Sequence, residues 1–228
     1  MRTRKLSKFA VVDDLLVVLD PGVQEPGDDT VWLSDISLEV DASSVLVAGC
    51  GSGLLALRLA RKCESVNAID LNPLAASCCH KNACANGLGD RIAVTVADMR
   101  DMIGKGRWDL VVSNPPQLPT LADAFRNDWV SMANDGGEDG RKVIDWLCGD
   151  GTDLIAPGGT LVFAHFAFLG IERTISMLQS KQLEVDVSEP LNKPLGVLSG
   201  ERLSMFADWV TGDYYSIVAL KARKAVRS

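Results

Sequence analysis

The sequence predicts an α/β protein with a Rossmann-like, doubly wound sheet of seven mostly parallel strands and helices on both faces. Apolar runs of strand length alternate with amphipathic stretches of helical length from about residue 43 onward. Several of these runs end on glycine or on one polar residue, which is typical of parallel sheets that bind ligands at their carboxyl ends. The 228 residues, of which 47% are apolar, suffice for one core of ordinary size.

The expected elements follow in order from the strand Val45–Ala48. A glycine turn leads from this strand to a helix over 54–62. Pro73 suits the first turn of the next helix, which Asn86-Gly87 ends with a glycine C-cap. The remaining elements are helices over 138–154 and 170–181, the first stopped by Pro157-Gly158-Gly159, and strands Val66–Ile69, Ile92–Val96, Leu110–Ser113, Thr160–Phe166, Leu183–Val187 and Tyr214–Leu220.

Both ends of the chain depart from this alternation. Residues 1–40 form a less regular preface, which we expect to pack on the main domain of residues 41–228. An excursion over about residues 189–213 separates the last two strands and either covers the site on the substrate side or is plain surface cover. After this long return, the C-terminal strand is expected to be antiparallel at an edge of the sheet.

Composition narrows the classes of partner and compartment. A formal charge of −7 argues against a duplex nucleic acid, because phosphate contacts come from a basic face. Asp13-Asp14 break the apolar run that begins at Phe9, so no signal-peptide core forms, and no apolar run is long enough to span a bilayer. Six cysteines without secretory features predict free thiols in a cytoplasmic protein. Cys78-Cys79-His80 lacks the paired spacing of zinc sites, so no metal is expected.

Glycines and acids mark three successive strand ends. Gly49, Gly51 and Gly53 follow the first strand, where glycine lets the backbone approach a ligand closely. Asp70 ends the second strand, where its carboxylate can accept both hydroxyls of a ribose. Asp98 follows the third strand and can accept from the exocyclic amine of adenine. Singly each acid could be a turn or N-cap residue, but three such endings together indicate a nucleotide-type site.

The fourth strand ends on Asn114-Pro115-Pro116. Each proline removes a backbone N–H and fixes φ, which holds Asn114 and Pro115 extended with their carbonyls pointing out of the ladder. The result is a row of acceptors, made of the Asn114 side-chain oxygen and one or two bare carbonyls. Such a row can hold an –NH2 group and direct its lone pair, although the tripeptide alone could equally be a turn.

With these strand ends the chain, from about Thr30 to the C-terminus, resembles the class I S-adenosylmethionine-dependent methyltransferases. Asn114-Pro115-Pro116 is similar to the motif of members that methylate an amide or exocyclic amine nitrogen. The stretches Pro26–Thr30, with Leu33, and Gly136–Gly140 resemble the HemK-type branch, which modifies a glutamine of peptide-chain release factors. The resemblance implies S-adenosyl-L-methionine as cofactor and a side-chain amide as acceptor, with glutamine in a protein first.

The same resemblance implies a role for each strand end. A sulfonium methyl needs a nucleophile placed in line, and two acceptors on an amide would favour a pyramidal nitrogen and stabilise the charge that develops on it. The implied cofactor contacts are Asp29, Thr30, Gly49, Gly51, Gly53, Asp70, Leu71, Asp98, Met99 and Asn114. The implied catalytic residues are Asn114, Pro115 and Pro116, and the implied substrate contacts are Asn114, Pro116, Gln117 and Arg202.

Three features depart from the family pattern. The first strand usually carries an acid for the cofactor's amino group, but Val47 stands at that position, so either Asp28 or Asp29 substitutes for it or the affinity for the cofactor is reduced. The residue after Asn-Pro-Pro is usually aromatic, but Gln117 cannot supply a π face. Forty residues are also too few for the helical recognition domain of the bacterial release-factor enzymes. A small-molecule amine or hydroxyl of a biosynthetic pathway is therefore the alternative acceptor.

Other classes fit the residues less well. Nucleic acid ranks third among the acceptor classes, because the negative net charge of the chain disfavours binding to phosphates. A non-catalytic cofactor-binding subunit would have no use for a constrained acceptor row. An NAD-dependent oxidoreductase is disfavoured because the glycines are spaced G-x-G-x-G and not G-x-G-x-x-G. His165, at the end of the fifth strand, is expected to be a hydrogen-bonded core histidine, and Trp32, Trp129 and Trp146 to be core or lid contacts.

Overall fold

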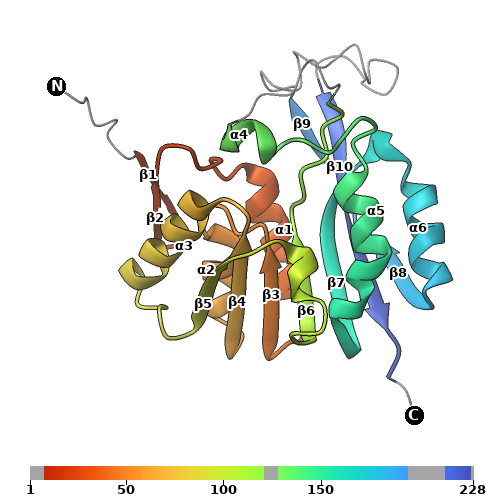
Figure 1. The fold of residues 1–228 in the computed structure, drawn as a ribbon, viewed down its shortest axis with the longest axis horizontal. Helices are drawn as coiled ribbons and strands as arrows, with labels where there is room; N and C mark the ends of the chain where they lie inside the picture. Colours follow the sequence, from red (N-terminus) through yellow and green to blue (C-terminus); the bar gives the residue numbers. More distant parts are fainter. Residues whose placement is uncertain (1–7, 121–127, 195–213, 227–228) are drawn as a thin grey trace.

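The structure, a computed structural model, describes residues 8–120, 128–194 and 214–226. Its main sheet has the strand order β5-β4-β3-β6-β7-β10-β8, with β9 paired to β10 (Figure 1). Strands β3 to β7 run parallel, and β10 is antiparallel to each of its neighbours. The predicted doubly wound, mostly parallel sheet is therefore confirmed, but within the described residues it has eight strands and not the seven expected, because β9 also pairs with β10. The strands are β3 (Ser44–Ala48), β4 (Ser65–Asp70), β5 (Ile92–Val96), β6 (Trp108–Ser113), β7 (Ile155–Phe166), β8 (Leu183–Val187), β9 (Leu191–Pro194) and β10 (Tyr214–Lys224).

The C-terminal strand β10 is antiparallel, as predicted, but it lies one strand in from the edge. It has β7 on one side and both β8 and β9 on the other. The physical reason is visible in Ile217–Leu220, an unbroken apolar run that is almost wholly buried. Such a run suits an inner strand covered on both faces, whereas an edge strand is more often polar.

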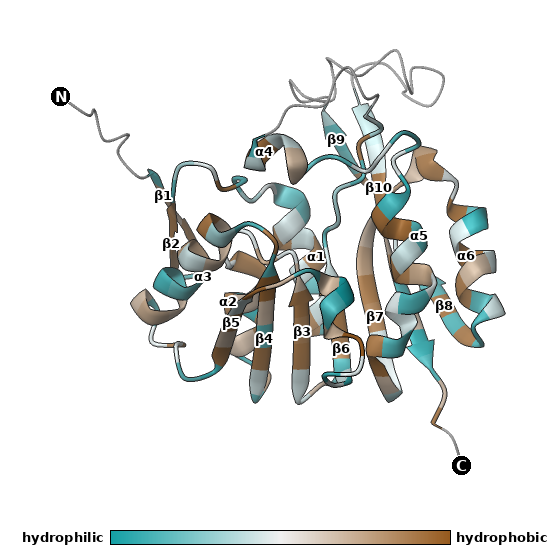
Figure 2. Ribbon diagram, viewed as in Figure 1, coloured by the Kyte–Doolittle hydropathy of each residue, from teal (hydrophilic) through white to brown (hydrophobic). Residues whose placement is uncertain are grey.

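Helices cover both faces of the sheet and divide the core into two layers. Helices α1, α2 and α3 share one layer with Val45, Val47 and Leu110. Helices α5 and α6 share the other with Leu46, Val111 and Phe163. Figure 2 shows the hydrophobic colour concentrated on the central strands between these layers. The helices are α1 (Asp28–Leu38), α2 (Leu54–Ala60), α3 (Pro73–Ala85), α4 (Trp129–Met132), α5 (Lys142–Cys148) and α6 (Ile171–Ser180), with 3₁₀ turns η1 (Met99–Met102), η2 (Asp150–Leu154) and η3 (Ala167–Leu169).

The ends of α3 follow from the sequence as predicted. Asn72 caps the helix by accepting a hydrogen bond of 2.9 Å from the Leu74 N–H, and Pro73 takes the first helical position. Gly87 follows the helix with φ of +69°.

The helix expected over 138–154 is wrong in its extent. Helix α5 begins only at Lys142, because Gly137 and Gly140 adopt left-handed φ values of +83° and +77° and form a loop. The Pro157-Gly158-Gly159 segment lies inside β7, beside a register shift between Trp108 and Leu110, and so does not simply stop a helix.

The preface is more regular than predicted. Strands β1 (Lys8–Val12) and β2 (Leu15–Leu19) form an antiparallel hairpin. Asp13 and Asp14, which looked like an interruption of an apolar run, are its turn, with φ values of +48° and +65°. The side-chain amide of Asn82 on α3 pairs with both the N–H and the C=O of Val18 at 2.9 Å, which docks the hairpin. The domain boundary at residue 40 stays a prediction.

None of the helices in the described ranges has the length and apolar character that crossing a membrane requires.

We predict that Gly53→Ala destabilises the fold more than Gly87→Ala does. Both glycines have positive φ, so either alanine costs about 1 kcal/mol in backbone strain. A Cβ at Gly53 would also lie 2.9 Å from Cys79 Sγ and 3.0 Å from Cys79 Cα, whereas a Cβ at Gly87 meets nothing within 4 Å. Urea unfolding should give Gly53→Ala an additional loss of about 1 kcal/mol or more. Equal losses for the two variants would contradict the close packing of the turn on α3.

Candidate active site

A cavity of about 390 Å³ lies where the carboxyl ends of β3, β4 and β6 meet. It has the size of a small-molecule site and the position expected in a doubly wound sheet. The predicted site residues that line it are Thr30, Gly49, Gly51, Asp70, Leu71, Asp98, Met99, Asn114 and Pro116. Asp29, Gly53, Pro115 and Gln117 do not line it, and Arg202 lies outside the described residues.

The turn after β3 leaves its backbone open toward this cavity. Gly49 and Gly51 have φ values of +81° and +54°, and a Cβ at either would meet no atom within 4 Å. The N–H groups of Gly49 and Cys50 both donate to the Ile69 carbonyl at 2.9 Å, which ties the turn to β4. Gly53 has a different function, since it packs on Cys79 of α3.

Asp70 both holds the glycine turn and lines the cavity. Its Oδ2 accepts from the Gly51 N–H and its Oδ1 from the Asn72 N–H, each at 2.9 Å. Burial raises the pKa of this carboxyl above its ordinary value, and the two N–H groups act in the opposite direction. Each carboxylate oxygen keeps capacity for a further donor, so a ligand hydroxyl can bind there.

Asp98 and Met99 open the short turn η1 at the far side of the cavity. Asp98 caps the turn by accepting from the Arg100 N–H at 2.9 Å, and its other oxygen lies 3.7 Å from the Arg100 guanidinium. Met99 packs against the α5 layer of the core, which fixes this wall of the cavity.

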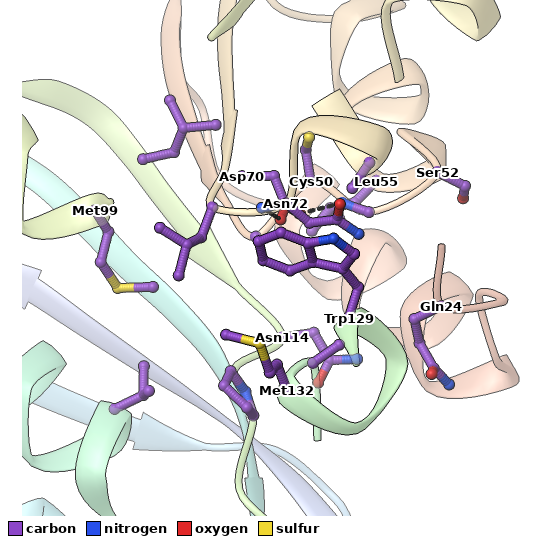
Figure 3. A pocket seen from close by; sticks show the side chains of 18 of the residues that line it. Gln24, Cys50, Ser52, Leu55, Asp70, Asn72, Met99, Asn114, Trp129 and Met132 are labelled. Atoms are coloured by element: carbon purple, nitrogen blue, oxygen red, sulfur yellow. Dashed lines mark hydrogen bonds between the residues drawn. The ribbon is translucent and has the colours of Figure 1, made fainter. Parts of the chain in front are cut away.

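Asn114 is held in one orientation by an acid from the preface. Its Nδ2 donates to Asp29 Oδ2 at 2.7 Å, across 85 residues of sequence. Because a carboxylate only accepts, the amide nitrogen must face Asp29, and Oδ1 lies on the opposite side of the amide. Figure 3 shows Asn114 at the cavity, on the side near Met132.

Gln117 continues the sheet where the prolines cannot. Only 2% of it is exposed; its Nε2 donates to the Ala164 carbonyl at 3.2 Å and its Oε1 accepts from the Phe166 N–H at 2.7 Å. A residue of a parallel strand opposite His165 would make the same two bonds. The side-chain amide therefore replaces a peptide unit of β6, and this geometry weighs against the predicted substrate contact of Gln117.

The glycine loop before α5 packs on the residues that directly follow the Asn-Pro-Pro segment. The Leu118 N–H donates to the Asn134 carbonyl and the Gly136 N–H to the Leu118 carbonyl, both at 2.9 Å. A Cβ at Gly136 would lie 2.6 Å from Gln117 Cα, so no larger residue fits this approach. The loop is thus a structural partner of the site.

The sequence predictions missed several residues that line the cavity, including Met132 and Val143. Trp129 and Met132 project from α4 toward the strand ends that bear Asp70 and Asn114 (Figure 3). Trp146, from α5, also lines the cavity, whereas Trp32 packs on the core. The only sequence signal for a cavity wall here was that Trp129 is the next aromatic side chain but one after the Asn-Pro-Pro segment.

His165 is fully buried and hydrogen-bonded, as expected for a core histidine. Its Nδ1 donates to the Phe166 carbonyl, and its Nε2 accepts from the Thr174 hydroxyl, both at 2.8 Å. The Thr174 oxygen in turn accepts from Arg141 at 2.9 Å, which leaves the hydroxyl proton for the imidazole. Burial, and secondly the charge of Arg141, lower the pKa of His165 to about 4.

The sheet topology is that of a Rossmann-like fold, and the cavity lies at the strand ends where such folds bind nucleotide-type ligands. A family model described as the methyltransferase small domain matches residues 30–129, from the first turn of α1 to the start of α4. The chain is an S-adenosylmethionine-dependent methyltransferase.

Relatives of this chain are named for different acceptors. A Methanocaldococcus jannaschii protein, named for an inferred protein N5-glutamine methyltransferase activity, is 28% identical over 184 residues, covering 80% of this chain and 92% of its own. The release factor glutamine methyltransferase of Deinococcus radiodurans is 36% identical, covering 60% of this chain and 52% of its own. A tRNA1(Val) (adenine(37)-N6)-methyltransferase of Porphyromonas gingivalis is 40% identical over 101 residues, 40% of each chain.

Solved structures agree on the fold. The crystal structure of the M. jannaschii tRNA m1G37 methyltransferase superposes with a TM-score of 0.65 at 17% identity, covering 99% of this chain and 56% of that one. The chain spans nearly the whole length of the M. jannaschii N5-glutamine relative. It spans about half the length of the Deinococcus enzyme and of the tRNA m1G37 methyltransferase.

We predict that Gln117→Met lowers the free energy of unfolding by about 2–3 kcal/mol, because it leaves the buried Phe166 N–H and Ala164 C=O without partners. Chemical denaturation measures the loss. Gln179→Met, at an exposed position of α6, is the control and should change stability by less than about 0.5 kcal/mol. A Gln117→Met protein as stable as the control would contradict the role of this amide in the sheet.

We also predict that His165 makes the fold sensitive to acid. Its pKa is near 6.5 in the unfolded chain and about 4 in the fold, so the unfolded state binds the proton first, and stability falls as pH drops from about 6.5 to 4. This group accounts for about 3 kcal/mol of that fall. In His165→Gln the fall measured by denaturation at several pH values should be smaller by this amount. His80→Gln, which removes the chain's other, exposed histidine, should keep the wild-type profile.

Proposed function

We propose that the enzyme methylates a side-chain amide nitrogen, with glutamine in a protein as the acceptor. The observation that supports this most directly is the fixed amide of Asn114, which lines the cavity beside Pro116 and next to the glycine turn and Asp70. A constrained acceptor row is useful for a nucleophile that has hydrogens to donate and a lone pair to direct.

The residues present fit the cofactor. Two glycines with open space before them allow a ligand to lie against the backbone, Asp70 can accept from ribose hydroxyls, and Asp98 with Met99 can border the adenine. The lining also includes the acids Glu25 and Asp135 and the basic residues Arg100 and Lys142. When bound, S-adenosyl-L-methionine supplies an electrophilic sulfonium methyl.

The chain's own contribution is to position and polarise the acceptor. Asn114 Oδ1 would accept one hydrogen of the acceptor –NH2, and a bare carbonyl of the Asn-Pro-Pro segment would accept the other. Taking both hydrogens weakens the delocalisation of the amide lone pair and stabilises the positive charge that forms on nitrogen. The methylated nitrogen carries a positive charge and must then lose one of its hydrogens, and because an N-protonated amide is strongly acidic it can release this proton to solvent. We therefore assign no general base, and the buried His165 is engaged with Thr174 and Phe166.

Protein glutamine is favoured among acceptors by two features. Two relatives are named for glutamine methylation. One is the M. jannaschii protein, nearly all of whose length the chain spans, and the other is the Deinococcus enzyme. The glycine loop Gly136–Gly140, which resembles the HemK branch in sequence, packs on Gln117 and Leu118, directly after the Asn-Pro-Pro segment. A small-molecule amine and a tRNA base are the alternatives, the latter because of the Porphyromonas relative.

We predict that radiolabelled methyl from S-adenosylmethionine enters the protein fraction of a cell extract when the wild-type enzyme is added. Asn114→Ala should lower this transfer by about 100-fold or more, because it removes the oriented acceptor. Calorimetry should show S-adenosylmethionine affinity within about threefold of wild type.

Radiolabel found only in small molecules or only in RNA would contradict the proposal that the acceptor is a protein. Equal losses of transfer and of cofactor affinity in Asn114→Ala would overturn the role assigned to Asn114. A thermal unfolding midpoint close to that of wild type verifies that the variant is folded.

A further inference from the structure

Asp29 is engaged in a way that the cofactor role does not explain. It was expected to substitute for the acid that Val47 replaces, yet it does not line the cavity. Its Oδ2 accepts from Asn114 Nδ2 at 2.7 Å, and its Oδ1 forms an ion pair with Lys193 of β9. The side chains of Asp29 and Lys193 are only 18% and 21% exposed.

The surrounding backbone is shaped for this pair. A Cβ at Gly27 would collide with Asp29 Oδ1 and lie 2.9 Å from Lys193 Nζ. Gly27 is also the residue before α1, so Asp29 stands in the first turn, where the helix dipole favours a carboxylate. Three elements that are distant in sequence, α1, the end of β6 and β9, therefore meet at one carboxylate.

We propose that Asp29 and Lys193 are a positioning pair for Asn114. Asp29 fixes the amide so that Oδ1, and not Nδ2, faces the acceptor nitrogen. It also polarises the amide, because donation from Nδ2 to a carboxylate increases the negative charge on Oδ1. Lys193 holds the carboxylate in place from the other side. The inference rests on the proposed function, and Asp29 acts through Asn114 and not on the cofactor.

The first test observes the pair without any acceptor. In ¹⁵N-labelled protein, the side-chain amide signal of Asn114 is identified by its absence in Asn114→Ala. We expect Asp29→Asn and Lys193→Met to shift this signal and to speed its exchange with solvent by about tenfold or more. Lys193→Arg should restore the signal, since arginine can also pair with the carboxylate. An unchanged signal in Asp29→Asn or in Lys193→Met would overturn the proposal.

The second test separates positioning from cofactor binding. Methyl transfer to the extract fraction labelled by the wild-type enzyme should fall about tenfold or more in Asp29→Asn and less in Lys193→Met. Calorimetric affinity for S-adenosylmethionine should stay within about twofold. Affinity that falls in step with transfer would overturn the pair in favour of a cofactor contact.

A matched control is available in Lys221 of β10, which forms an ion pair of 2.6 Å with Glu39 just after the other end of α1. Its side chain is 27% exposed, similar to Lys193. Lys221→Met should leave both the Asn114 signal and methyl transfer at wild-type values, and a loss equal to that of Lys193→Met would overturn a specific role for the pair.

If Asn114→Ala transfers methyl normally, the proposed function fails, while the Asn114 signal still reports on the pair.

Discussion

Two adjacent prolines at the end of β6 remove two backbone N–H groups beside a parallel neighbour, and the site is arranged around this loss. The ladder between β6 and β7 reaches Ser113 and Phe163 and then has no main-chain donor to continue with. The Gln117 amide takes over the pairing with β7, so the N–H and C=O groups there remain bonded. The carbonyls of the proline segment are thereby released from the sheet without leaving β7 unpaired.

This arrangement requires support from several directions. The loop that leads to α5 packs on Gln117 and Leu118, and the network of Arg141, Thr174 and His165 fixes the end of β7 behind it. On the opposite side, Asp29 holds the amide of Asn114. Rigid support of this kind suits the proposed transfer to an amide nitrogen, a poor nucleophile, since the rate depends steeply on the alignment of the reacting atoms.

Strand ends could be predicted from the sequence because their signals are local. Apolar runs, a glycine turn and single acids placed Gly49, Asp70 and Asp98 at one cavity without any knowledge of contacts. The role of Gln117 could not be predicted, because its partners lie 47 and 49 residues away and the sequence gives no sign of their register. The partners of Asp29 lie 85 and 164 residues away. The hairpin β1–β2 was missed for a simpler reason, since a two-aspartate turn with positive φ is less common than Asn-Gly.

The departure at Val47 now has a physical context. Val47 is fully buried in the layer that α1 and α2 form with the sheet, so an acid there would need a partner in an apolar environment. Negative charge at the cavity comes instead from Asp70 and Asp98, at the neighbouring strand ends, and from Glu25 of the preface. Asp29 is then not required as a substitute for that acid and can serve Asn114. In the proposed arrangement Asp29, with its charge balanced by Lys193, positions the Asn114 amide and leaves recognition of a cationic cofactor to the strand ends, so that the two functions can vary independently.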